Sequence, residues 1–427
     1  MVRRVVLGML ALLVVGYVPL AATSMWFTVL PGFPRWQEDL DAWLGGHAYA
    51  WGSGSVAAVR TAAYVDHRVA LLVHTTLGAV ALCLLLAQAL LLRRGGGPGS
   101  LHRRLGWAYV GAVVVSMLAS FVFLLRAPHL AVPGQTGFRL QLWLLGLSTL
   151  GTVVLGVLAS RRGDREAHRA WLTLSACFLL TAPLLRLLWS TLGALVPGHT
   201  MLTNLEVSAV ALAVVAPGTG AALHAWTSSP VARGGRSGRG VLLPVAVVGV
   251  VGEAVVLLRF AALDGPATPA LYPWFHVVPM LVFGLVIARG RPAAWARLGV
   301  ALAVVPWAVL VVALALEPWL GTAESLRAGL MCGPGFPLVA SVGVALAARR
   351  SDDRPGAGYC ARMEQSNREQ GRGEISEVDN LGDGGEIEPG DSVAGHPHDR
   401  DVQEGATGPD ARTGDQDQDR DQDRTRR

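Results

Sequence analysis

Long apolar runs separated by short polar segments fill the first 350 residues of the chain. A run of about 20 apolar residues is long enough to cross a lipid bilayer as a helix. Such runs cover residues 5–30, 68–92, 105–125, 138–160, 170–192, 202–224, 241–261, 271–288, 298–316 and 328–348. The pattern predicts an all-α, polytopic integral membrane protein, a helical bundle of about ten transmembrane helices. Because the first run is longer than the core of a usual signal peptide, we expect an uncleaved helix there.

Arginines recur in every second loop between these runs. Short cytoplasmic loops of membrane proteins accumulate basic residues, whereas the opposite loops do not. The arginine-rich segments are the N-terminus and the loops after the second, fourth, sixth, eighth and tenth runs, with Arg3, Arg4, Arg93, Arg94, Arg103, Arg104, Arg161, Arg162, Arg165, Arg169, Arg233, Arg236, Arg239, Arg289, Arg291, Arg297, Arg349 and Arg350. The alternation predicts that the N-terminus and the C-terminus are both cytoplasmic.

Composition changes sharply after residue 350. Residues 351–427 hold 20 acidic side chains and 10 arginines, whereas the preceding body holds 11 acidic side chains and 26 arginines, a net charge of +15. Low hydrophobicity and repeated charge predict a disordered acidic cytoplasmic tail. The basic body is typical of loops facing anionic lipid, so we expect the lipid bilayer as partner and no nucleic acid. The tail is either a solvated appendage or the binding site of a redox or other protein partner.

These patterns divide the chain into four parts. Residues 1–66 contain the first transmembrane helix and an outer loop, and residues 67–192 form a four-helix membrane core with histidine motifs. Residues 193–350 contain five further helices, and residues 351–427 form the tail. The outer loop carries Trp36, Trp43 and Trp51, which predict a segment lying in the membrane interface. With 52% hydrophobic residues and no lysine, the chain is typical of a multi-pass protein of a bacterial cell (inner) membrane.

Small and polar residues recur at helical spacing along the four core helices. Such stripes let membrane helices approach and hydrogen-bond one another, so we expect one bundle with these faces inward. The stripes are His74, Gly78, Ala81, Leu85 and Gln88; His102, Gly106, Tyr109, Val113, Ser116 and Ser120; Gln141, Ser148 and Thr152; and His168, Ser175, Ala182 and Arg186. The expected topology places His102 and His168 together at the cytoplasmic side, and His74 and Arg186 nearer the outer side. Pro183 predicts a kink in the fifth helix.

At these motifs the sequence resembles known proteins. His74 with Gly78 and Gln88, then LHRRLGWAY and AHRAWLTLSACFLL, resemble the domain-of-unknown-function family 2306 of predicted bacterial membrane proteins over residues 66 to 192. That resemblance implies a four-helix membrane domain without an established activity. The core is more weakly similar to transmembrane di-haem cytochromes b, which implies haem b with His102 and His168 as axial ligands. Unlike those proteins, this chain has no histidine on the fourth helix opposite His74; His129 lies in the preceding loop.

Several roles stay open for the candidate cofactor-binding residues His102, His168, His74 and Arg186. The first two bind haem, bind another metal or ligand, or lie at the interface and contact lipid phosphates. For His74 we expect a buried hydrogen bond to Gln88 or to a serine or threonine of a neighbouring helix. Arg186 neutralises a haem propionate or an anionic substrate, or extends to the interface.

The later helices contribute one deep acidic residue. Glu253 lies in the middle of its run, where an ionisable side chain indicates a proton or cation site, or else a protonated or arginine-paired structural acid. No catalytic site, nucleotide-binding loop or DNA-binding signature is recognisable, and the four scattered cysteines predict neither disulfides nor zinc. The leading functional hypothesis is transmembrane electron transfer through haem. The alternatives are a small-solute or ion transporter, and a membrane scaffold or sensor acting through the tail.

Overall fold

Helices are the only regular elements in the part of the chain that the structure describes. This computed structural model describes residues 2–352 apart from 94–98, 128–133, 197, 228–237, 265–270 and 290–291. The predicted disorder of residues 351–427 falls almost wholly outside the described residues, as does His129. The expectation of an all-α protein is confirmed for the described part.

The helices follow the chain in a simple order. The N-terminal half contains α1 (Val2–Thr23), a 3-10 turn at Trp26–Thr28, α2 (Trp36–Gly45), α3 (His47–Trp51), α4 (Val56–Asp66), α5 (Arg68–Arg93), α6 (Ser100–Arg126), α7 (Gln135–Arg161), α8 (Arg165–Leu179) and α9 (Thr181–Leu195). The later part contains α10 (Met201–Thr227), α11 (Gly238–Asp264), α12 (Leu271–Arg289), α13 (Pro292–Leu320), α14 (Thr322–Cys332) and α15 (Gly335–Asp352). We call α2 to α4 the cap.

The helices have the lengths that a multi-pass membrane protein needs. Within the described residues, nine helical stretches are long and apolar enough to cross a membrane, α8 with α9 and α14 with α15 each counting as one. The remaining predicted run, 271–288, corresponds to a shorter apolar helix, Tyr272–Ala288. All ten predicted runs are therefore helical, and nine of them reach spanning length.

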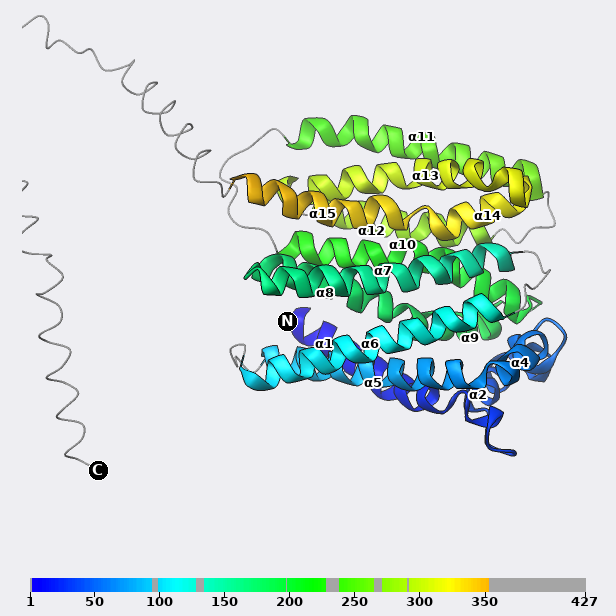
Figure 1. Ribbon diagram of the computed structural model, residues 1–427. Coiled ribbons are helices and arrows are strands. Elements are labelled where there is room, and N and C mark those ends of the chain that lie inside the picture. Colours follow the sequence, from blue (N-terminus) through cyan, green and yellow to red (C-terminus); the bar gives the residue numbers. More distant parts are fainter. Residues whose placement is uncertain are drawn as a thin grey trace, which may run out of the picture. The chain divides into compact units, whose positions relative to one another are not determined.

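Helix α10 lies at the centre of the bundle (Figure 1). It packs against α7, α8 and α9 on one side and against α12, α13 and α15 on the other. Of its apolar stretch 78% is buried, against 50% or less in the other long apolar helices of the described residues. A helix that is hydrophobic all round is suited to such a position, because every face meets another helix.

The polar stripes of α5 and α6 face each other as predicted. His74 lies against Ser116 at one end of the pair, and the Gln88 side chain donates to the backbone carbonyl of His102 at the other, with a distance of 3.2 Å. Gly106 lies close to Gln88, since a Cβ atom there would be 3.3 Å from the Gln88 amide nitrogen. Small residues thus allow the close approach of two antiparallel helices.

The stripe of α7 corrects part of the expected bundle. The Gln141 side chain faces α10, where its amide donates to the Ala209 carbonyl at 2.7 Å, and does not point into the four-helix core. The reason is that α7 packs against both α8 and α10, so its polar positions have two sets of neighbours. The kink expected beside Pro183 is confirmed, because α8 ends at Leu179 and α9 begins at Thr181.

Candidate functional site

A cavity of about 230 Å³ lies between the helices at the cap end of the N-terminal half. Side chains of α1, α4, α5, α6, α7, α8 and α9 form its wall, and most of them are apolar. Its polar and charged members are Tyr17, Arg60, Tyr64, His74, Thr75, Ser116, Ser120, Thr149 and Arg186. None of the described residues that line it is an aspartate or a glutamate. We call this space the Arg186 cavity.

His74 is fixed in the wall of this cavity by Ser116. Its Nδ1 lies 3.0 Å from the Ser116 carbonyl oxygen, and the Ser116 hydroxyl donates to the His74 carbonyl at 2.9 Å. A carbonyl only accepts, so Nδ1 carries the proton and Nε2 is the acceptor nitrogen of the neutral ring. The expected hydrogen bond to a serine of a neighbouring helix is confirmed.

Arg186 brings a cation into the cavity without a carboxylate in direct contact, although Glu38 and Asp41 of the cap lie near enough to act on its charge. Its guanidinium carbon lies 5.8 Å from the ring centre of Tyr17 and 5.9 Å from that of Trp189. Within the described part of the chain, no carboxylate lies within 4.0 Å of the guanidinium. A charge in an apolar, membrane-embedded setting is costly unless it is paired, so this side chain is suited to an anionic ligand.

Arg60 of α4 is a second cation at the same cavity. Its guanidinium donates to the side-chain oxygen of Gln135 and lies 5.3 Å from the ring centre of Phe138. Sequence reasoning missed Arg60, because it belongs to the outer loop and no spacing relates it to the core stripes. Together with Arg186, it gives an apolar cavity a positive potential.

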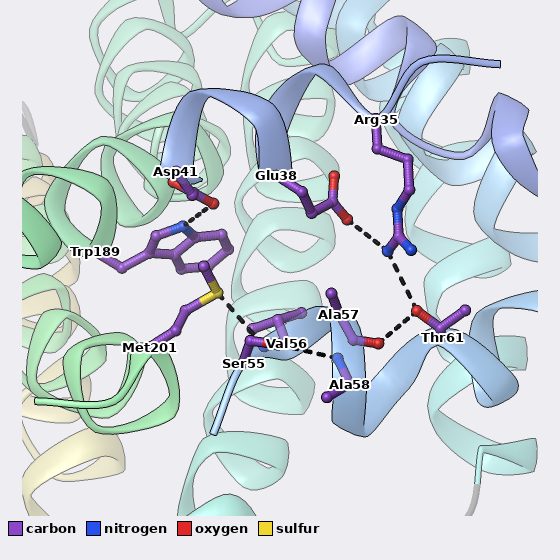
Figure 2. A network of polar contacts seen from close by, with 10 residues as sticks. All are labelled: Arg35, Glu38, Asp41, Ser55, Val56, Ala57, Ala58, Thr61, Trp189 and Met201. Carbon is purple, nitrogen blue, oxygen red and sulfur yellow. Dashed lines mark hydrogen bonds and ion pairs between the residues drawn. The ribbon is translucent and has the colours of Figure 1, made fainter. Parts of the chain in front are cut away.

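A buried carboxyl fastens the cap to α9. Asp41 of α2 is 1% exposed and accepts hydrogen bonds from Gln37 at 3.2 Å, from Trp189 at 3.4 Å and from the Ser190 hydroxyl. Burial raises the pKa of the Asp41 carboxyl to about 6, although these donors act in the opposite direction. Figure 2 shows Asp41 on the face of α2 that points toward Trp189.

Further contacts hold the cap together and join it to α9. The Arg35 guanidinium binds the carboxylate of Glu38 at 2.8 Å and the hydroxyl of Thr61 at 3.2 Å, which links α2 to α4 (Figure 2). Tyr49 of α3 donates to the Trp189 carbonyl at 2.5 Å, and burial raises the pKa of its hydroxyl to about 12. The side chain of Trp43 in α2 is 79% exposed.

His102 and His168 lie outside the residues that line the Arg186 cavity. The Nδ1 of His168 is 2.8 Å from the Gly156 carbonyl, whereas the Nδ1 of His102 is buried without a hydrogen-bond partner among the described residues. Farther along, the hydroxyls of Tyr109 and Ser175 lie 3.3 Å apart and connect α6 to α8. Tyr109 follows His102 by seven positions, and Ser175 follows His168 by seven positions, which is nearly two helical turns in each case.

Glu253 has a partner that the sequence did not indicate. Its Oε2 lies 3.2 Å from the Nε2 of His276, which is fully buried, on the neighbouring helix α12. Neither residue lines the Arg186 cavity. The acid thus lies within ion-pair distance of a histidine, although neither atom has a hydrogen-bond partner among the described residues.

Comparison with known proteins gave no relative for this chain. No family model matches it, and neither a curated protein nor a solved structure does.

Proposed function

We propose that this protein is a membrane transporter that binds a small, largely apolar organic anion in the Arg186 cavity. The observation that carries the proposal is the Arg186 guanidinium in an apolar cavity whose described lining contains no carboxylate. A carboxylate ligand would neutralise this cation through a charge-assisted hydrogen bond. The guanidinium of Arg60 lies in the same wall and would orient it, whereas the acceptor nitrogen of the neutral His74 ring cannot donate to a carboxylate.

The size and walls of the cavity support an aromatic carboxylate. Its volume of about 230 Å³ exceeds the roughly 150 Å³ of an engineered apolar cavity that takes up benzene. Its aromatic lining residues include Phe123, Phe138, Phe178 and Trp189. Benzoate combines an apolar ring with one negative charge and is therefore the probe that we choose.

The orientation of the protein in the membrane, and the coupling of transport to a proton or cation, belong to the same proposal. The arginine alternation supports cytoplasmic termini and a cap on the outer face of a bacterial inner membrane. Glu253, with His276 beside it, is the proposed proton or cation site of the later helices. The resemblance of residues 66 to 192 to the domain-of-unknown-function family 2306 stays a prediction.

Flux through proteoliposomes tests the transporter proposal. We expect saturable uptake of radiolabelled benzoate by the full chain and a loss of at least about tenfold in Arg186→Gln. Arg169→Gln is the matched control, because Arg169 is an exposed arginine at the start of α8 that lies outside the cavity lining. Equal uptake by the two variants would contradict the proposal, and uptake that is indifferent to Glu253→Gln would remove Glu253 from it.

Electron transfer through haem is a second candidate, favoured by the contact between Tyr109 and Ser175. Because α6 and α8 run in the same direction, this contact supports His102 and His168 at one level (Figure 1). His168 has the Nδ1 hydrogen bond to a carbonyl that metal-binding imidazoles usually make, but His102 lacks it, so the fit is partial. A bound haem would be held by His102 and His168 and would supply one-electron chemistry.

An absorption spectrum decides between the two candidates. Protein purified after expression with ample haem would show a Soret band that His168→Ala removes, if the haem hypothesis holds. Absence of that band from the full chain would exclude it.

The scaffold or sensor hypothesis depends on the tail and predicts that deletion of residues 355–427 abolishes the phenotype while the membrane part stays folded.

A further inference from the structure

A chain of hydrogen bonds leads from the Arg186 cavity to a buried acid at the centre of the bundle. Arg60, in the cavity wall, donates to the side-chain oxygen of Gln135. The amide of Gln135 donates to the Oε1 of Glu206 at 2.9 Å, and the Tyr272 hydroxyl donates to the Oε2 of the same carboxylate. Glu206 lies on α10 and is 5% exposed, and Gln135 is 3% exposed. The cavity and the later helices α10 and α12 are thereby joined.

The orientation of the Gln135 amide is fixed by its two partners. A guanidinium only donates and an ionised carboxylate only accepts, so the amide oxygen must face Arg60 and the amide nitrogen must face Glu206. The two hydrogen bonds depend on each other, because rotation of the amide would break both. Arg60 therefore strengthens the amide donor to Glu206 through one neutral side chain, in addition to Arg327, whose charge acts on the same carboxylate.

The other charged and titratable groups around Glu206 are already engaged. On α14, Glu324 accepts from the backbone N–H groups of Gly134 at 2.7 Å and Gly137 at 3.3 Å, and lies 3.7 Å from Arg327. The guanidinium of Arg327 also lies 6.0 Å from the Tyr272 ring centre. Donors thus surround Glu324 directly, whereas Glu206 accepts from a neutral amide and a phenol.

From this arrangement we infer that Glu206 takes up a proton from solvent when an anion occupies the Arg186 cavity. An anion near Arg60 competes with Gln135 for the guanidinium. Glu206 then loses support for its negative charge, and a buried carboxylate without support binds a proton. The inference rests on the proposed function and specifies how anion binding in the N-terminal half is coupled to protons at α10.

Linkage makes this coupling measurable in both directions. If one proton binds with each anion, the affinity for the anion rises as pH falls, by up to about tenfold per pH unit. Benzoate itself stays ionised between pH 6 and pH 9, so a pH effect in that range belongs to the protein.

Calorimetry on the full chain in detergent tests the inference. Benzoate binding measured in buffers of different ionisation enthalpy gives the number of protons taken up, and we expect a net uptake of up to one proton per benzoate at pH 7. In Glu206→Gln, benzoate should still bind and proton uptake should fall to nearly zero. Glu317→Gln, which changes a carboxyl outside the cavity lining, should keep both the binding and the proton uptake. Proton uptake that persists in Glu206→Gln, or that disappears in Glu317→Gln, overturns the inference.

Infrared spectroscopy gives a second test that needs no ligand. Arg60→Gln removes one of the cations near Glu206, so the C=O band of a carboxylic acid should be stronger at pH 7 than in the unaltered chain. The added band should be absent from the Arg60→Gln/Glu206→Gln double variant. Without that increase the coupling of Arg60 to Glu206 is wrong, whatever binds in the cavity. Failure of the full chain to bind benzoate would instead overturn the proposed function and its link to Glu206, even with the band present.

Discussion

His74 and Ser116 bind each other across the interface of two antiparallel helices. The Nδ1 of His74 lies 3.0 Å from the Ser116 carbonyl oxygen and 3.1 Å from the Ser116 hydroxyl, which itself donates to the His74 carbonyl at 2.9 Å. Side chain and backbone of each residue thus engage the other. The pair sets both the register of α5 against α6 and the position of an imidazole in the cavity wall.

Removal of the Ser116 hydroxyl should therefore destabilise the folded protein. In Ser116→Ala the hydrogen bond from Nδ1 to the carbonyl stays, but the hydroxyl contacts are lost, and we expect a loss of about 1 kcal/mol. Thermal unfolding in detergent measures it. Ser120→Ala is the matched control, because the Ser120 hydroxyl bonds only to the Met117 carbonyl of its own helix. Equal shifts in the two variants would show that the His74 contact contributes nothing.

This interface is the part of the fold that the sequence predicted best. Two stripes at helical spacing, on consecutive helices with a short loop, can pair in one antiparallel register, and the contact of Gln88 with His102 follows from it. Gln141 shows the limit of the same reasoning. Its spacing marks a polar face of α7, but nothing in the sequence says whether α6, α8 or α10 lies against that face.

Gly134 should tolerate no side chain. Its φ is +79°, and a Cβ atom would overlap the Glu206 carboxylate. Gly163 has a similar φ of +74° but open space around it, so Gly163→Ala isolates the backbone strain of roughly 1–2 kcal/mol. We expect Gly134→Ala to lower the thermal midpoint clearly more than Gly163→Ala does. Equal midpoints would mean that the backbone of Gly134 does not lie against Glu206.

The stability of the cap should depend on pH through Asp41. Its pKa is about 6 in the folded protein and 3.8 in a solvated chain, so the folded state binds the proton more tightly. The free energy of unfolding should therefore fall as pH rises from about 4 to about 6, by about 3 kcal/mol, and stay level above.

Comparison with Asp41→Asn isolates this contribution from other titrating groups. The variant lacks the ionisable group, so its thermal midpoint should fall less steeply between pH 4 and pH 6 than that of the unaltered chain. Parallel pH profiles for the two proteins would exclude Asp41 as the source of the dependence.

Other polar contacts could not have been predicted from spacing. Asp41 and Ser190 are 149 positions apart, and Gln135 and Glu206 are 71 positions apart, on elements whose relative rotation only packing determines. The sequence did mark Arg186 and His74 as polar residues at similar depth. That they share one cavity with Arg60 depends on how α4 docks beside α5, which no periodicity describes.

The most direct test of the account is the affinity of the purified full chain for benzoate, measured by calorimetry with and without Arg186. An arginine–carboxylate hydrogen bond contributes about 1.5–3 kcal/mol, which corresponds to roughly 10- to 150-fold in affinity. We therefore predict that Arg186→Gln weakens binding by at least about tenfold, that Arg186→Lys weakens it less, and that Arg169→Gln leaves it unchanged. Benzoate binding of equal strength in Arg186→Gln and the unaltered chain would contradict an anion site at Arg186.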